Sequence, residues 1–201
     1  MGATRGPTVG SDIQALAVQA TPPLWRQMTW WVLALPALMV AALVRHSLYL
    51  LDYTHVLSGA LWTGADLFLG FIIGPVMRRL RPDQRKAVVT YLVPRTLLYM
   101  PVVAITTGTA GWFLASREGL LSSGSSDRPW VIAALVIIAV LTVQGLGLLL
   151  PNNVRIYREL QRPQPNIARV LRINRINLVL SGVQGAMQVA IIVVMAHLAV
   201  G

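Results

Sequence analysis

The 201-residue sequence contains no cysteine, three histidines and only seven acidic residues. The missing cysteines exclude a disulfide framework, a thiolate metal site, an iron–sulfur cluster and a cysteine nucleophile. The few acids and histidines leave little material for a catalytic triad. The sequence patterns of phosphate-binding loops, serine-hydrolase elbows and zinc proteases are also missing. We therefore do not expect an ordinary soluble hydrolase or kinase.

Charge is scarce in this chain, and apolar residues are abundant. Charged residues make up 12% of the sequence and hydrophobic residues 55%, which is too apolar for an ordinary soluble domain. The apolar residues form long stretches, and roughly 20 residues of helix cross the ~30 Å hydrocarbon core of a bilayer. The composition therefore predicts an all-α integral membrane protein.

Five apolar stretches are separated by polar, basic or proline-containing segments. We predict transmembrane helices over residues 24–44, 53–77, 96–115, 129–150 and 176–200. Residues 1–23 are predicted to form a cytoplasmic tail, and residues 24–201 a single transmembrane domain. Asp52 is the predicted N-cap of the second span, while Pro94 ends a short interfacial helix and Pro151 ends the fourth span. The last four spans are expected to form an antiparallel four-helix core, to which the N-terminal helix is added.

Basic residues give the chain a formal charge of +10 and cluster in two short segments. The first contains Arg78, Arg79, Arg81, Arg85, Lys86 and Arg95, and the second contains Arg155, Arg158, Arg162, Arg169, Arg172 and Arg175. Basic loops stay cytoplasmic, so we predict that both clusters and the N-terminus are inside and the C-terminus outside. Anionic lipid headgroups, rather than nucleic acid, are the expected partner. The residues predicted to contact them are Arg78, Arg79, Arg81, Arg155, Arg158 and Arg162.

Ionisable side chains within the hydrocarbon are costly and therefore mark candidate functional sites. His55 lies near the outer end of the second span, Asp66 near its middle, and His197 near the outer end of the fifth. At about 100° per residue, His55, Gly59, Trp62 and Asp66 fall on one face of the second helix. This face is predicted to look into the bundle.

Small residues predict close helix contacts. Gly70 and Gly74 form a GxxxG step in the second span. The fifth span carries a ladder of small residues: Gly182, Ala186 and Ala190. Gln184 and Gln188 share another face of that helix, and we expect the ladder to make the closer contact.

The positions of His55 and His197 suggest a shared ligand. Both lie about one helical turn from the predicted outer surface, on helices that are neighbours in an antiparallel bundle. Two neutral imidazoles at one depth could be the axial ligands of a b-type haem. Alternatively, each histidine extends separately to the interface. Copper is a further candidate, because Met195 and His197, with His46 on the same side, supply thioether and imidazole groups suited to copper(I).

Asp66 is compatible with the roles of proton relay, counter-ion or neutral hydrogen-bond donor. Its candidate partners are the polar side chains of the third and fourth spans: Thr106, Thr107, Thr109 and Gln144. Trp62 is expected to pack against neighbouring helices rather than to carry out redox chemistry.

Part of the sequence resembles a known group of proteins. Residues 55–66 read His-Val-Leu-Ser-Gly-Ala-Leu-Trp-Thr-Gly-Ala-Asp, and Gly74-Pro-Val-Met-Arg-Arg79 and Thr107-Gly-Thr-Ala-Gly111 follow. Over about residues 50–115 this pattern resembles copper-resistance D-type proteins and related uncharacterised small polytopic membrane proteins of bacteria. The resemblance implies the bacterial inner membrane, and a haem- or copper-binding role for His55. Small-type protoporphyrinogen oxidases share the histidine followed by Trp-x-Gly, but their extended motif is missing here.

Three functions follow from these residues and this resemblance. The first is a b-haem electron-transfer protein that exchanges electrons with quinone or an external partner. The second is a non-catalytic subunit that scaffolds a larger membrane complex. The third is a copper-handling membrane protein.

Overall fold

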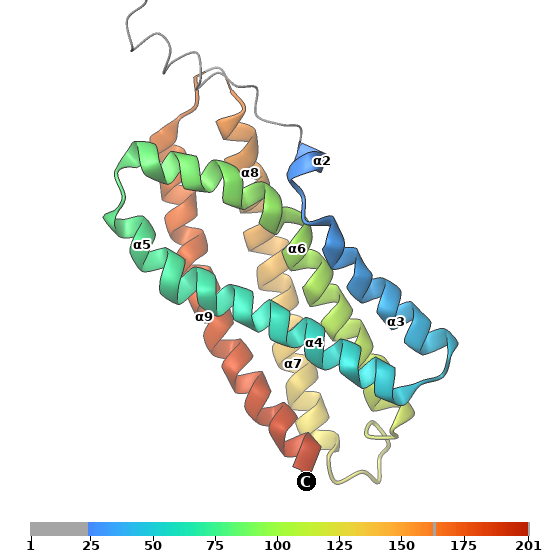
Figure 1. Ribbon diagram of the computed structural model, residues 1–201. Coiled ribbons are helices and arrows are strands. Elements are labelled where there is room, and N and C mark those ends of the chain that lie inside the picture. Colours follow the sequence, from blue (N-terminus) through green and yellow to red (C-terminus); the bar gives the residue numbers. More distant parts are fainter. Residues whose placement is uncertain (1–23, 163, 201) are drawn as a thin grey trace, which may run out of the picture.

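The computed structural model describes residues 24–162 and 164–200, which form a bundle of helices (Figure 1). The predicted N-terminal tail lies outside these residues. Four helical stretches are long and apolar enough to cross a membrane: Leu48–Arg79, Asp83–Arg117, Arg128–Leu160 and Ile167–Val200. The predicted all-α membrane class is therefore confirmed.

Two of the four stretches contain a π-helical segment. The first consists of α4 (Leu48–Leu67), the π-helical η2 (Phe68–Ile73) and α5 (Gly74–Arg79), and α6 (Pro82–Arg117) follows it. The third stretch consists of α7 (Arg128–Gln144), the π-helical η3 (Gly145–Leu149) and α8 (Leu150–Leu160), and α9 (Ile167–Val200) follows. Before them come α2 (Leu24–Gln27), the 3-10 helix η1 (Trp30–Leu33) and α3 (Ala34–Val44).

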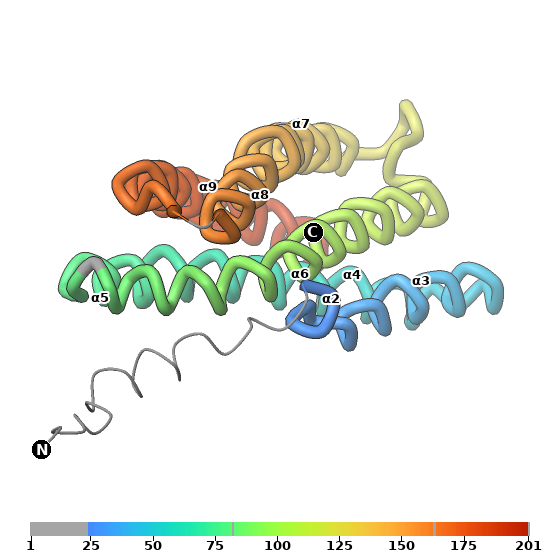
Figure 2. The backbone as a smooth tube through the Cα atoms, turned by 90° about the horizontal axis from the view of Figure 1, so that it is seen from above, coloured from blue at the N-terminus to red at the C-terminus, as the bar shows by residue number. Residues whose placement is uncertain are grey.

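The helices alternate in direction and form two layers. α3, α4 and α6 make one layer, and α7, α8 and α9 cover it (Figure 2). The α5–α6 and α8–α9 connections lie together at one end of the bundle, termed here the basic end, because the two basic clusters lie in these connections and on the helices beside them (Figure 1). The α3–α4 turn, the α6–α7 connection and the end of α9 lie at the opposite end. The predicted placement of both clusters at one end is therefore confirmed.

Two prolines that were predicted to end helices lie within helical stretches. Pro94 is an interior residue of α6, so the separate interfacial helix is wrong. Pro151 follows η3, in which the N–H of Leu150 bonds to the carbonyl of Gly145, five residues back. The N–H of Gly74 makes the same bond to Leu69 just before Pro75. A proline ring clashes with the carbonyl four residues earlier in a regular α-helix, and the wider π turn accommodates it.

The α3–α4 connection is short and closes with a left-handed residue. The N–H of Ser47 bonds to Ala42 O at 3.0 Å and that of His46 to Leu43 O at 3.3 Å. This is the closure of a Schellman motif, in which glycine normally takes the left-handed position. Here His46 takes it, with φ of 52°. Ser47 then caps α4 by accepting from the Leu50 N–H at 3.2 Å, so the prediction of Asp52 as N-cap is wrong.

The predicted first span is divided into short elements. Its apolar helical part, Trp30–Val44, covers about 22 Å at ~1.5 Å per residue, less than the ~30 Å hydrocarbon core. Val32 and Leu35 pack against Trp62 in the core, so this segment belongs to the α4–α6 layer. Four spanning stretches are therefore established, and the fifth crossing is not.

His46 occupies a conformation that costs an L-residue about 1 kcal/mol, and that glycine adopts freely. We expect His46→Gly to raise the free energy of unfolding by roughly 0.5–1 kcal/mol and His46→Val to lower it. Thermal unfolding in detergent micelles measures both changes. Arg45→Gly, at the neighbouring right-handed position, is the control and should destabilise. A less stable His46→Gly protein would show that the imidazole contributes more than the backbone strain costs.

Candidate functional site

The face of α4 that carries the intramembrane polar residues is directed into the bundle, as predicted. Thr54, Ser58, Trp62 and Asp66 are all buried. In the half of α4 away from the basic end, this face contacts α6, where the Thr107 hydroxyl donates to Ser58 Oγ at 3.0 Å. Trp62 packs in the hydrophobic core, which matches the packing role expected for it.

Asp66 joins the two layers of the bundle near the middle of the spanning stretches. Its Oδ2 accepts hydrogen bonds from Nε2 of Gln184 at 2.8 Å and Nε2 of Gln188 at 2.9 Å. The two glutamines lie one turn apart on α9, and all three side chains are at least 98% buried. Trp62, one turn earlier on α4, is a further polar neighbour of the carboxyl group.

The predicted partners of Asp66 are wrong. Gln144 donates instead to the backbone carbonyl of Leu180 at 2.6 Å, and Thr107 bonds to Ser58 and to Val103 O. The actual partners, Gln184 and Gln188, lie on a different face of α9 from the small-residue ladder, which was predicted to make the closer contact. Ala186 and Ala190 of that ladder are exposed on the outer surface of the bundle. The available signal was an i, i+4 pair of amides in an apolar helix at the depth of Asp66.

Three oxygen atoms of this cluster have no hydrogen-bond partner among the described residues. They are Oδ1 of Asp66, Oε1 of Gln184 and Oε1 of Gln188. A buried acceptor without a donor costs about 1–3 kcal/mol, and such groups are rare in folded proteins. Asp66 also forms no ion pair with the described residues. Within the described part of the chain, the carboxyl group therefore has only neutral donors beside it, the two glutamine amides and Trp62, and no positive partner.

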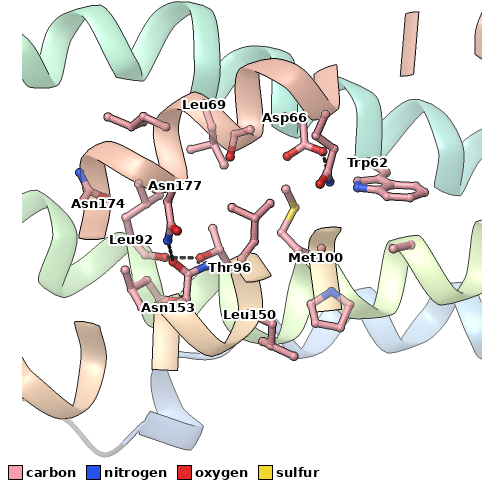
Figure 3. A pocket seen from close by; sticks show the side chains of 18 of the residues that line it. Trp62, Asp66, Leu69, Leu92, Thr96, Met100, Leu150, Asn153, Asn174 and Asn177 are labelled. Atoms are coloured by element: carbon pink, nitrogen blue, oxygen red, sulfur yellow. Dashed lines mark hydrogen bonds between the residues drawn. The ribbon is translucent and has the colours of Figure 1, made fainter. Parts of the chain in front are cut away.

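A cavity leads from this cluster toward the basic end. Its volume is about 100 Å³, which is room for more than one water molecule at roughly 30 Å³ each. Figure 3 shows Asp66 and Trp62 at one side and Asn153 and Asn177 at the other. The rest of the lining is mostly apolar, with hydroxyl groups contributed by Thr96, Thr142 and Ser181.

The asparagines at the far side of the cavity form an amide network. Asn152 Nδ2 donates to Asn177 Oδ1 at 2.9 Å, and Asn177 Nδ2 donates to Asn153 Oδ1 at 2.8 Å. These bonds tie α8 to α9. They also place a cluster of polar groups at the side of the cavity away from Asp66.

Both π-helical segments adjoin the cavity. η2 begins two residues after Asp66, η3 begins directly after Gln144, and residues of both segments line the cavity wall. π-helical turns occur frequently at functional sites. Their presence on two sides of one cavity marks it as the best candidate site in the described part of the chain.

The two candidate haem ligands have separate partners. His55 Nδ1 lies 2.9 Å from the carbonyl oxygen of Thr107, and because a carbonyl only accepts, Nδ1 carries the proton. The His55 ring rests on Gly111, where an added Cβ would lie 2.7 Å from ring Cε1. His197 instead stacks on Trp130 of α7, with ring centroids 4.0 Å apart. Toward the end of the bundle opposite the basic end, where both histidines lie, α4 and α9 diverge (Figure 1).

The remaining predicted site residues lie apart from the cavity. Met195 is half-buried on α9, and no group of three or more metal-ligating His, Cys, Asp or Glu occurs among the described residues. Arg81 pairs with Asp83 at 3.2 Å, and Arg162 with the buried Glu159 at 3.1 Å. The other predicted headgroup ligands are exposed at the basic end: Arg78, Arg79, Arg155 and Arg158.

Comparisons with protein-family models, curated proteins and solved structures found no match to this chain. The function must therefore be argued from the chemistry of the site itself.

The partly satisfied polar cluster should reduce stability rather than add to it. We expect Asp66→Leu to destabilise by roughly 2–4 kcal/mol, because it leaves two buried amides unpaired. The triple variant Asp66→Leu/Gln184→Leu/Gln188→Leu should be at least as stable as the wild type, since apolar replacement of a whole buried polar group is often stabilising. Thermal unfolding in micelles measures both, with Gln144→Leu as the control outside the cluster. A triple variant less stable than Asp66→Leu would assign the cluster a structural role.

Proposed function

We propose that this multi-pass membrane protein binds an exchangeable proton or small cation at Asp66, within the membrane. The observation that carries this proposal is a set of three buried oxygens, one on the Asp66 carboxyl group and two on the adjoining glutamines, that have no hydrogen-bond partner among residues 24–162 and 164–200. A carboxylate in low-dielectric surroundings without a positive partner is strongly disfavoured. A bound proton or cation supplies what the cluster lacks.

The glutamines can serve both states of such a site. Each amide presents a donor on one side and an acceptor on the other, so a half-turn exchanges Nε2 for Oε1 at the carboxyl group. With Nε2 toward Asp66, as in this structure, they stabilise the anion. With Oε1 turned inward, they would accept from a protonated Asp66 or coordinate a cation. Carboxylate and amide oxygens are suitable ligands for hard cations.

The cavity supplies a route to the site from the basic end. The positive-inside rule places that end in the cytoplasm, and the proposed location is the bacterial inner membrane. In this proposed arrangement residues 24–44 make a fifth crossing, with the N-terminus inside and the C-terminus outside. The ion would then exchange with the cytoplasm through the asparagine network, as in a component of an ion-coupled membrane process.

Two measurements on purified protein in micelles test the Asp66 site. Infrared difference spectra between acid and alkaline pH should show a protonated-carboxyl band that Asp66→Asn removes. If the ligand is a cation, Na⁺ or K⁺ should instead raise the melting temperature, by the equivalent of about 2.7 kcal/mol at one hundred times the dissociation constant. The stabilisation should be lost in Asp66→Asn and kept in Asp52→Asn, which changes an exposed acid. If Asp66→Asn alters neither response, the proposal fails.

A second candidate function is haem-linked electron transfer with quinone or another redox partner, and one observation favours it. The Thr107 carbonyl holds the proton of His55 on Nδ1 and leaves Nε2 free as a ligand. This is the arrangement by which proteins orient metal-binding histidines. Ligation of one iron by both His55 and His197 would require them to leave their present partners on α6 and α7.

The visible spectrum of the purified protein decides between these functions. If a b-type haem is bound, His55→Ala should abolish low-spin absorption, and His197→Ala should do the same only if it is the second ligand. His46→Ala should leave the spectrum intact. Asp66, about 16 Å further along the helix at ~1.5 Å per residue, should not affect it. A colourless, metal-free preparation would eliminate the haem and copper proposals and leave the ion site or a scaffolding subunit.

A further inference from the structure

A second hollow lies at the basic end, on the lipid-facing side where α4 and α5 meet α9. This groove encloses about 680 Å³. Glycines line it toward the middle of the bundle (Gly70, Gly74 and Gly182), and arginines line it toward the basic end, termed here its mouth (Arg78, Arg85, Arg172 and Arg175). The side walls are apolar, with Leu178 and Val179 on α9 and Met77 on α5. It is separate from the Asp66 site and independent of the function proposed for that site.

The glycines give the groove a floor of bare backbone. A Cβ added at Gly70 would lie 3.6 Å from the Cα of Gly182, so the two helices approach closely there. A Cβ added at Gly182 would meet no atom within 4 Å, because it would project into open space. On α9, Arg172, Arg175, Val179 and Gly182 follow a helical repeat on one face. The groove therefore runs from the basic end toward the membrane interior, changing from charged to apolar.

The arginines at the mouth lack acidic partners in the described part of the chain. The acids of this end are already engaged, Asp83 with Arg81 and Glu159 with Arg162 and Arg169. Arg85 donates to the backbone carbonyls of Leu80 and Arg78, both at 2.8 Å. These bonds hold its guanidinium at the mouth. Several positive charges thus surround one opening without a compensating negative group.

We propose that this groove is a specific site for one anionic phospholipid. The phosphate of this lipid lies among Arg78, Arg85, Arg172 and Arg175, and one of its acyl chains extends over the glycine floor. Guanidinium groups bind phosphate oxygens in paired hydrogen bonds, and basic pockets between transmembrane helices bind lipid headgroups. The charge of the mouth selects an anionic headgroup, while the apolar interior selects an acyl chain over a free phosphate. Of the arginines predicted from sequence to contact headgroups, only Arg78 belongs to this site.

Native mass spectrometry of the full-length protein, delipidated and then titrated with dioleoylphosphatidylglycerol, tests this site. The variant Arg78→Gln/Arg172→Gln/Arg175→Gln should weaken retention of the lipid roughly tenfold or more, since it removes three of the positive charges that attract the headgroup. The matched control Arg79→Gln/Lys86→Gln/Arg158→Gln removes the same charge from exposed positions of the same end. It should retain the lipid. Equal losses in the two variants would show general surface attraction and overturn the site.

The acyl-chain part of the proposal has its own variants. Gly182→Leu fills the floor without changing charge and should weaken lipid binding several-fold, whereas Gly182→Ala, with one methyl group in open space, should fold normally and weaken it less. Inorganic phosphate at millimolar concentration should not displace the lipid. Undiminished binding by both glycine variants, or displacement by phosphate, would overturn the lipid assignment. Melting temperatures of all variants establish that any loss occurs in folded protein.

Discussion

The hydrocarbon core offers no hydrogen bonds, and that constraint accounts for most of this structure. Each backbone N–H and C=O within the membrane must find a partner in the protein. The spanning segments are therefore helical from end to end, and they remain helical through Pro94, Pro101 and Pro151. Where a proline would break the regular pattern in α4–α5 and α7–α8, the chain shifts to π-helical bonds instead of opening a loop. The same constraint is why three oxygens in the bundle centre that have no partner among the described residues are the basis for proposing a bound proton or cation.

The glycine contacts position the polar cluster. Gly70 lies one turn beyond Asp66, and its backbone approaches that of Gly182, just before Gln184. An added Cβ at Gly185 would lie only 3.0 Å from the Leu67 side chain. This close crossing of α4 and α9 lets a short aspartate side chain reach two glutamines on the neighbouring helix. Gly182 and Gly185 of α9 thus act at the same crossing as the two glutamines.

Much of the architecture could be predicted from composition and charge, because hydropathy and basic clusters act over whole segments. The inward face of α4 could also be predicted, since an aspartate, a histidine and a tryptophan on one stripe are unsuited to lipid. The continuation of the helices through Pro94 and Pro151 could not be predicted, because the intramembrane setting of a proline overrides its local tendency to end a helix. The partners of Asp66 depend on the rotation of α9 about its own axis. An evenly apolar helix gives no periodic signal for that rotation, and both of its faces offered plausible contacts.

The π-helical segments also determine which way the basic ends of the two helical stretches that contain them face. A π turn takes in one residue more than an α turn, and one residue corresponds to about 100° of rotation. Residues beyond η2 are therefore turned relative to the stripe that carries His55, Trp62 and Asp66. This rotation allows one continuous helix to present its polar stripe to α6 and α9 and then to direct Arg78 toward the groove beside α9. A single-residue deletion within Phe68–Ile73 would restore regular α-helix and leave the length of the span almost unchanged. It would nevertheless rotate Arg78 about the helix axis relative to Asp66, so that the two side chains would no longer face their present neighbours together.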